Sequence, residues 1–179
     1  MIILGVDPGL NATGYGAIEA SGRRLEVLAA GDIRPPNTRP LAERLEVIHQ
    51  ALDELMGRWR PTTVVLETLY THAHHLTTAA MMAHARGVAC LAAEQRHIPV
   101  VEYSPNRVKQ SVTGHGTASK DQVARMVKQW LGTAESSWSF DATDALALAI
   151  AHAQMDRQHQ RGEVFRIARR RRTVRLARS

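Results

Sequence analysis

Apolar runs alternate with turn residues through the first part of the chain and predict three strands in succession. The runs cover residues 2–6, 13–19 and 25–33, and Gly or Pro residues mark the turns that follow them. Two further apolar runs, at 62–66 and 99–103, predict strands that lie apart from this meander. We therefore expect five strands, of which the first three are joined by short turns.

Helices are predicted between and after the later strands, where apolar residues recur at helical spacing or fill a longer segment. The predicted helices cover residues 41–55, 76–95, 107–112, 120–131 and a last segment that starts at residue 140 or 141. Ser119 and Gln122 have the spacing of a capping box at the start of the fourth helix. A strand meander followed by strand–helix–strand units implies an α/β fold with a mixed sheet flanked by helices.

Length and composition limit the class of protein. At 179 residues we expect one domain, or one domain with a tail. No apolar stretch is long enough to span a bilayer, and the N-terminus lacks the pattern of a signal peptide. The single cysteine, Cys90, excludes an intramolecular disulfide framework and fits a reducing cytoplasm. We therefore expect a cytoplasmic protein without membrane contact, in which Cys90 is an unreactive core residue.

Positive charge is concentrated at the C-terminus. The formal net charge is +6, and the segment 166–179 contains seven arginines and no acidic residue. The rest of the chain keeps 16 of the 23 basic residues against 17 acidic ones, so it is close to neutral. We expect a domain over residues 1–157 and a flexible basic tail over 158–179. Such a tail is typical of an arm that binds nucleic acid, although a solubilising segment would have the same composition.

Four carboxylates occupy positions that the predicted fold can bring together. Asp7 and Glu67 stand at or near the carboxyl ends of two strands, and open α/β sheets place their sites at this edge. Asp141 and Asp144 are three residues apart, so a helix presents them on one face. If the two strands are neighbours, we expect the acids to converge at one edge of the sheet.

Carboxylates gathered in this way repel one another unless cations lie among them. Oxygen ligands without cysteine or histidine suit Mg²⁺ or Mn²⁺, and two such ions can activate water for phosphodiester cleavage. Each acid also has a simpler interpretation: Asp7 suits a turn, Glu67 a solvated strand end, and Asp141 a helix N-cap. A chain without a metal site would require all of these simpler interpretations to hold together.

Several sequence blocks, taken together, identify a family. They are residues 3–9 (ILGVDPG), 13–16 (TGYG), 85–89 (ARGVA), 108–120 (VKQSVTGHGTASK) and 141–147 (DATDALA). Through these blocks the chain resembles the Holliday junction resolvases of the RuvC family over residues 1–156. The resemblance implies a ribonuclease H-like fold with a mixed five-stranded sheet. It also implies a structure-selective endonuclease that resolves four-way DNA junctions in recombination and repair, and residues 71–82 depart most from the family pattern.

The resemblance assigns roles to the four acids. Asp7, Glu67 and Asp141 match positions at which the family holds Mg²⁺ and cuts DNA strands near the crossover. Asp144 matches the fourth acidic position, where relatives also carry histidine. We therefore expect all four to be catalytic metal ligands, with Mg²⁺ as the cofactor, Mn²⁺ as a possible substitute and two ions per active site.

The resemblance also places DNA-binding residues around these acids. Lys109 and Lys120 match basic positions near the family's active site, and Arg107 is their neighbour. Lys120 lies in the first turn of a capped helix, where phosphate is favoured in any case. Tyr70 matches an aromatic residue that stacks on an unpaired base near the crossover. The simpler interpretations are a solvated lysine for Lys120 and a buried tyrosine for Tyr70.

Two matched cuts in a junction of near two-fold symmetry imply a homodimer with two active sites. The apolar segment 81–91 is a candidate dimer face, although a helix buried in its own domain would look the same. The family also works beside a branch-migration complex.

A zinc site at His72, His74 and His75 is the weaker interpretation, because one short loop without cysteine is a poor ligand set. The role of these histidines and of His115 stays open.

Two other classes of protein remain as alternatives. Actin-like ATPases and sugar kinases also begin with a strand, an aspartate and a Gly/Thr hairpin that holds phosphate. They need two halves around the nucleotide, however, and this chain lacks a second glycine-rich phosphate hairpin. A non-catalytic DNA-binding module on the same fold is the other alternative, and the presence of all four acids argues against it.

Overall fold

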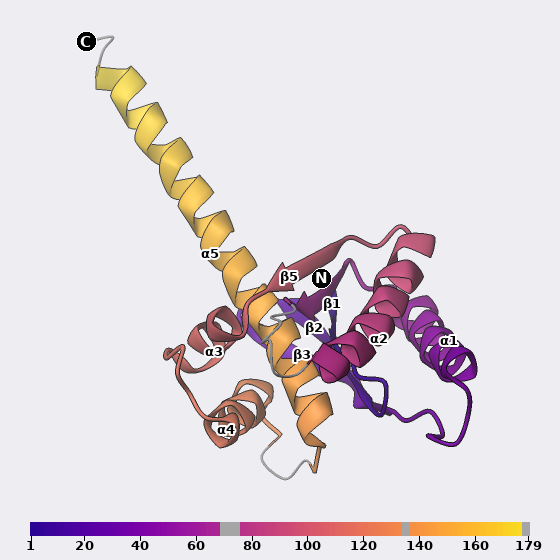
Figure 1. Ribbon diagram of the computed structural model, residues 1–179. Helices are drawn as coiled ribbons and strands as arrows, with labels where there is room; N and C mark the ends of the chain where they lie inside the picture. Colours follow the sequence, from indigo (N-terminus) through magenta and orange to yellow (C-terminus); the bar gives the residue numbers. More distant parts are fainter. Residues whose placement is uncertain (69–75, 134–136, 177–179) are drawn as a thin grey trace.

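The computed structural model describes the backbone of residues 1–68, 76–133 and 137–176, and the side chains of residues 1–68, 79–133 and 137–159. A central sheet lies between two helices on one side and three on the other (Figure 1). Helix α5 crosses the sheet and then extends well beyond it (Figure 1). Within the described part of the chain, no helix is long and apolar enough to cross a membrane.

The sheet has five strands, as predicted. They are β1 (Ile2–Asp7), β2 (Thr13–Ser21), β3 (Arg24–Ile33), β4 (Thr63–Glu67) and β5 (Val100–Tyr103). Their order across the sheet is β3-β2-β1-β4-β5. The meander of β1, β2 and β3 is antiparallel, whereas β4 pairs in parallel with β1 and β5 in parallel with β4. The prediction of a mixed five-stranded sheet is therefore confirmed.

The described residues form five helices in addition to the strands. They are α1 (Leu41–Trp59), α2 (Leu76–Gln95), α3 (Pro105–Thr113), α4 (Lys120–Leu131) and α5 (Phe140–Leu176). Helix α3 begins two residues earlier than predicted, because Pro105 is well suited to the first turn of a helix. The predicted capping box is present, since Ser119 and Gln122 each bind the backbone amide of the other.

Side chains alternate across the strands and form two cores. Leu4 and Val6 of β1, together with Leu66 of β4, pack in one core with residues of α1 and α2. Ile3 of β1 and Val65 of β4 lie on the other face, in a core shared with α3, α4 and α5. This alternation fixes the direction of any side chain at the end of β1 or β4, since successive residues of a strand point to opposite faces.

Glycines allow α5 to lie directly against the sheet. A Cβ atom added at Gly5 would lie 1.9 Å from the carbonyl oxygen of Ala145, and one at Gly14 would lie 2.0 Å from that of Asp141. Only a residue without a Cβ atom permits such a close approach. The first turn of α5, which carries Asp141 and Asp144, is thereby held at the ends of β1 and β2.

Helix α5 also passes the predicted boundary between domain and tail. Its backbone remains helical from Phe140 to Leu176, so the segment predicted as a flexible tail is helical over most of its length. The division of the chain into residues 1–157 and 158–179 stays a prediction, as does the role of the arginines in the second part.

Candidate nuclease site

Asp7 and Glu67 are adjacent in register at the carboxyl ends of β1 and β4. These strands are parallel neighbours, and their register pairs Val6 with Leu66, directly before the two acids. Val6 and Leu66 face the core formed with α1 and α2. The two acids therefore point to the opposite face, which α3, α4 and α5 cover.

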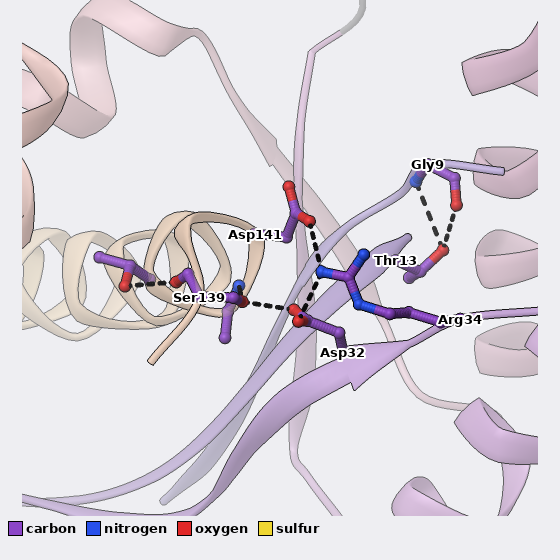
Figure 2. A network of polar contacts seen from close by, with 8 residues as sticks. Gly9, Thr13, Asp32, Arg34, Ser139 and Asp141 are labelled. Carbon is purple, nitrogen blue, oxygen red and sulfur yellow. Dashed lines mark hydrogen bonds and ion pairs between the residues drawn. The ribbon is translucent and has the colours of Figure 1, made fainter. Parts of the chain in front are cut away.

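The turn after Asp7 is closed by the buried side chain of Thr13. The Thr13 hydroxyl donates a hydrogen bond of 2.7 Å to the carbonyl oxygen of Gly9 and accepts one of 3.3 Å from the Gly9 amide (Figure 2). This pair of contacts ties the end of β1 to the start of β2. The sequence Asp7-Pro8-Gly9 is thus a turn, as the simpler interpretation of Asp7 proposed, but the turn also presents the carboxylate to a cleft.

The cleft lies between the strand ends and the helices of the second core. It has a volume of about 250 Å³, and three of the predicted acids and two of the predicted lysines line it. The lining residues are Asp7, Glu67, Pro105, Val108, Lys109, Lys120, Val123, Asp144, Ala147 and Leu148. Residues from β1, β4, α3, α4 and α5 therefore meet in one place, although they are far apart in the sequence.

Asp141 lies beside this cleft rather than in its lining. Ser139 occupies the N-cap position of α5, since it directly precedes Phe140 and its hydroxyl accepts a hydrogen bond of 3.0 Å from the amide of Ala142. The simpler interpretation of Asp141 as the N-cap is therefore wrong. The Asp141 carboxylate instead forms an ion pair with Arg34, with 3.6 Å between Oδ2 and the guanidinium nitrogen.

Burial and mutual repulsion act on the carboxylates of the cleft. Burial raises the pKa of Asp7 to about 7, and the charges of Asp144, Glu67 and Asp141 add to this shift. Burial also raises the pKa of Glu67 and of Asp144, while the positive charge of Lys120 acts in the opposite direction on both. Glu67 is partly buried and lines the cleft, so the interpretation of Glu67 as a freely solvated strand end is wrong.

The chemistry of the acids suits a hard divalent cation, but their positions do not form a complete set of metal ligands. Within the described ranges, no three His, Cys, Asp or Glu side chains are arranged to hold a metal ion as they stand. Lys120 Nζ lies 3.4 Å from Oδ2 of Asp144, and Arg34 pairs with Asp141, so cationic side chains face two of the acids. An all-carboxylate donor set suits Mg²⁺ or Mn²⁺, and a cation would stabilise the ionised form of Asp7, whose pKa is raised by burial first and by the neighbouring carboxylates second.

The predicted DNA-binding residues differ in where they lie. Lys109 and Lys120 line the cleft from α3 and α4. Arg107 is exposed and lies over the ring of Tyr103, with 5.4 Å from its Cζ to the ring centroid, and it does not line the cleft. Tyr70 lies outside the described residues.

Other sequence predictions concern residues that do not line the cleft or that the structure does not describe. The histidines at positions 72, 74 and 75 also lie outside the described residues. His115 is exposed in the loop between α3 and α4. Cys90 is partly buried on α2, and burial raises the pKa of its thiol, which agrees with an unreactive residue.

The structure adds Arg86 of α2 to the residues around the site. Its guanidinium donates a hydrogen bond of 2.5 Å to the carbonyl oxygen of Glu67 and forms an ion pair with Glu102 of β5. Arg86 belongs to the sequence block 85–89, which was noted only as part of a family pattern. The block indicated the family, but only the structure shows that Arg86 contacts Glu67.

A second addition is a group of three residues near Asp141. Asp32 and Arg34, at and just after the end of β3, contact Ser139 and Asp141 at the start of α5 (Figure 2). Nothing in the local sequence marks these positions, because the contacts span more than a hundred residues.

Carboxylates converging at the ends of β1 and β4, beneath a helix that crosses the sheet, define a nuclease-type site on a ribonuclease H-like fold. Comparison with known proteins agrees with this class. The family model described as crossover junction endodeoxyribonuclease RuvC matches residues 3–152. The chain therefore belongs to the RuvC family of crossover junction endodeoxyribonucleases.

Individual relatives support the same assignment. A crossover junction endodeoxyribonuclease RuvC from Natranaerobius thermophilus is 43% identical over 161 residues, covering 90% of this chain and 99% of the relative. The protein of the same name from Alkaliphilus oremlandii is 44% identical over 153 residues, covering 86% of this chain and 93% of the relative. These coverages show that the similarity extends over nearly the whole length of both proteins.

Solved structures give the same answer for the fold. RuvC of T. thermophilus in complex with a Holliday junction substrate is 32% identical, with a TM-score of 0.83, covering 89% of this chain and 96% of that one. The yeast mitochondrial Holliday junction resolvase Ydc2 has a TM-score of 0.67 at 12% identity, covering 91% of this chain and 83% of that one, and it supports the fold alone. The predicted family and fold are therefore confirmed, and the alternative of an actin-like ATPase or sugar kinase is not favoured.

Proposed function

We propose that this chain resolves four-way DNA junctions by hydrolysing one phosphodiester bond per active site in a metal-dependent reaction. The observation that carries the proposal is the cleft, in which Asp7, Glu67 and Asp144 meet Lys109 and Lys120. Acids that can bind cations and lysines that can bind phosphate are the two components that phosphodiester cleavage requires. Membership of a family of crossover junction endonucleases supports a junction as the substrate.

The proposed cofactor is Mg²⁺, with Mn²⁺ as a possible substitute and two ions per site. Asp7, Glu67 and Asp144 would hold it, and Asp141 would join them after leaving Arg34. A bound divalent cation supplies a more acidic water and stabilises charge on the phosphate oxygens. The chain's own contribution is to gather the carboxylates in a half-buried cleft, where their repulsion favours a cation over solvent.

The proposed path of the DNA follows the basic residues. Lys109 and Lys120 would bind phosphates on either side of the cleaved bond, because they enter the cleft from two different helices. Lys120 also lies at the N-terminus of α4, where backbone amides favour an anion. The stacking role of Tyr70, a contact from Arg107 and binding by the arginines of residues 166–178 remain parts of the proposal that rest on the sequence.

A homodimer is proposed as the working unit, since two symmetric cuts need two sites. Met81 and Leu91 of α2 are 44% and 52% exposed, so the predicted dimer face has apolar side chains available for a partner. Ala85 and Ala89 lie in the core, so α2 is buried on one side and apolar on the other. Cooperation with a branch-migration complex and a cytoplasmic location remain predictions from the sequence.

The proposed function is tested with a synthetic four-way junction and a linear duplex of the same sequence, each with Mg²⁺ or with a chelator. We expect cleavage of the junction alone, and only with Mg²⁺. Asp7→Asn and Glu67→Gln should bind the junction without cutting it, because loss of negative charge does not weaken attraction to phosphate. Asp53→Asn, on α1 and outside the cleft, is the matched control and should cut normally. Cleavage by both site variants at the unmodified rate would refute the proposal.

A further inference from the structure

A polar network outside the acidic cleft joins the end of β3 to the start of α5 (Figure 2). Asp32 accepts a hydrogen bond of 2.5 Å from the hydroxyl of Ser139 and one of 2.9 Å from the guanidinium of Arg34. The side chain of Asp32 is only 14% exposed, so water competes little for these contacts. Asp32 lies on β3, which contributes no residue to the cleft lining, so its role must be sought in these two contacts.

The contact with Ser139 determines how α5 begins. The Ser139 hydroxyl has a single proton, which it donates to Asp32, so its oxygen is free to accept the amide of Ala142 at 3.0 Å. The carbonyl oxygen of Ser139 also accepts the amide of Thr143 at 3.0 Å and the Thr143 hydroxyl at 2.7 Å. Asp32 therefore orients the group that caps the helix, and it fixes the position of the first turn relative to the sheet.

The contact with Arg34 acts on the same turn. Arg34 lies between Asp32, at 2.9 Å, and Asp141, at 3.6 Å. Asp141 and Asp144 both belong to the turn that Ser139 caps, and Asp144 lines the cleft while Asp141 faces Arg34. The position of both acids thus depends on contacts that converge on Asp32.

We propose that Asp32 is a positioning residue for the nuclease site, which acts through Ser139 and Arg34 to place Asp141 and Asp144 relative to Asp7 and Glu67. The inference rests on the proposed function, because it treats the acids of α5 as metal ligands. Asp32 itself is not among the residues that line the cleft. Outer partners of this kind commonly change metal affinity or activity by about 10- to 100-fold when they are removed.

The first test measures α5 without any metal. In Asp32→Ala and in Ser139→Ala, we expect the amide of Ala142 to exchange with solvent at least about tenfold faster than in the unmodified protein, because Ser139→Ala removes the capping oxygen and Asp32→Ala removes the group that orients it. Asp32→Asn keeps an oxygen that can accept from Ser139, so its exchange should stay close to that of the unmodified protein. Asp53→Ala is the matched control, since Asp53 is also paired with an arginine, Arg96, but this pair joins α1 to the residue after α2 and not to α5.

The second test measures binding of Mn²⁺ to the metal-free protein by electron paramagnetic resonance. Asp32→Ala should weaken binding by about tenfold, and Asp53→Ala should not change it. The double variant with Ser139→Ala should bind no more weakly than the weaker single variant, because both changes break one contact. Asp32→Asn should give an intermediate affinity, because it keeps the contact with Ser139 and loses the charge that holds Arg34. This variant serves as the test if Asp32→Ala does not fold.

The outcomes separate this inference from the proposed function. Suppose that the unmodified protein cuts junctions and that Asp32→Ala binds Mn²⁺ as tightly as the unmodified protein does. The inference is then refuted and the function stands. If Asp32→Ala does not fold, Asp32→Asn is compared in its place. If Asp32→Ala weakens Mn²⁺ binding and the unmodified protein cuts no junction, the inference stands and the function is refuted. An unmodified protein that binds no Mn²⁺ would refute both, and additive effects of Asp32→Ala and Ser139→Ala would refute the shared contact.

Discussion

The guanidinium of Arg86 donates a hydrogen bond of 2.5 Å to the carbonyl oxygen of Glu67, at the point where β4 ends beside the cleft. The arginine side chain is only 12% exposed, and its other partner is Glu102 of β5. Arg86 thus reaches from α2 to the backbone of the last residue of β4. The direction of the Glu67 carboxylate is therefore tied to the helix that carries the predicted dimer face.

This contact predicts the effect of changing Arg86. Arg86→Gln should lower the free energy of unfolding by about 1–3 kcal/mol, because it removes a largely buried charged donor from a partly buried acceptor. It should also slow junction cleavage at saturating Mg²⁺, because Glu67 is no longer held at the cleft. Glu102→Gln leaves the bond to Glu67 intact and should cut at close to the unmodified rate, measured in single-turnover assays. Equal loss of cleavage in both variants would assign the effect to the ion pair instead.

Gly14 is expected to tolerate no side chain. An added Cβ would lie 2.0 Å from the carbonyl oxygen of Asp141, so Gly14→Ala must push α5 away from the sheet. We expect the free energy of unfolding to fall by about 1–3 kcal/mol and cleavage to be lost with it, because the acids of α5 move. Gly87→Ala is the stability control, since a Cβ there meets no atom within 4 Å and alanine is the better helix former. Denaturant unfolding of both variants makes the comparison.

The raised pKa of Asp7 predicts how pH acts on the metal-free protein. The folded state keeps a proton on Asp7 up to about pH 7, whereas the unfolded chain loses it near its ordinary value of 3.8. The free energy of unfolding should therefore fall as pH rises between these values, by roughly 4 kcal/mol at most. Asp7→Asn should remove the part of this dependence that belongs to Asp7, while Glu67 and Asp144, whose pKa values are also raised, keep their own parts, and it should make the metal-free protein more stable at pH 8. Thermal unfolding from pH 5 to pH 8 measures this pH dependence of stability. A melting temperature of the unmodified protein that does not change with pH would contradict the prediction.

Added Mg²⁺ should reverse this effect, because a cation stabilises the ionised carboxylate. The melting temperature of the unmodified protein at pH 8 should rise with Mg²⁺, and that of Asp7→Asn should rise less. Cleavage at low Mg²⁺ should increase with pH up to about 7, since metal binding requires loss of the proton.

Lys120 is expected to contribute one phosphate contact. Lys120→Gln should weaken junction binding and lower the slope of log affinity against log salt concentration by about one. Lys128→Gln, on the same helix but outside the cleft lining, is the matched control and should leave both quantities nearly unchanged. Fluorescence anisotropy at several salt concentrations provides the measurement. Identical slopes for the two variants would remove Lys120 from the DNA-binding surface.

Removal of residues 163–179 tests the basic segment at the C-terminus. The truncation deletes all seven arginines of residues 166–178 and should weaken junction affinity at moderate salt, with a smaller salt slope. Cleavage at saturating protein should persist, because residues 1–162 retain all four acids. Equal affinity with and without the segment would show that its charge has no part in binding.

Much of the fold and part of the site could be predicted from the sequence, because their signals are local. Strands and helices follow from periodic apolar residues, and the start of α4 follows from Ser119 and Gln122, which bind one another's amides within a single turn. Asp7 and Glu67 could be predicted to meet only on the condition that their strands are neighbours, and the parallel pairing of β1 with β4 fulfils this condition. The family blocks then indicated which of the acids to expect at the site.

Tertiary structure alone decided how the acids are held. Asp32 and Ser139 are 107 residues apart, and no periodicity or spacing relates them, yet their hydrogen bond sets the start of α5. Only the packed structure shows that Asp141 faces Arg34 while Asp144 lines the cleft. The physical reason is that local patterns depend on the geometry of one helix or strand. Burial, ion pairs and raised pKa values depend on which segments come together when all the elements pack.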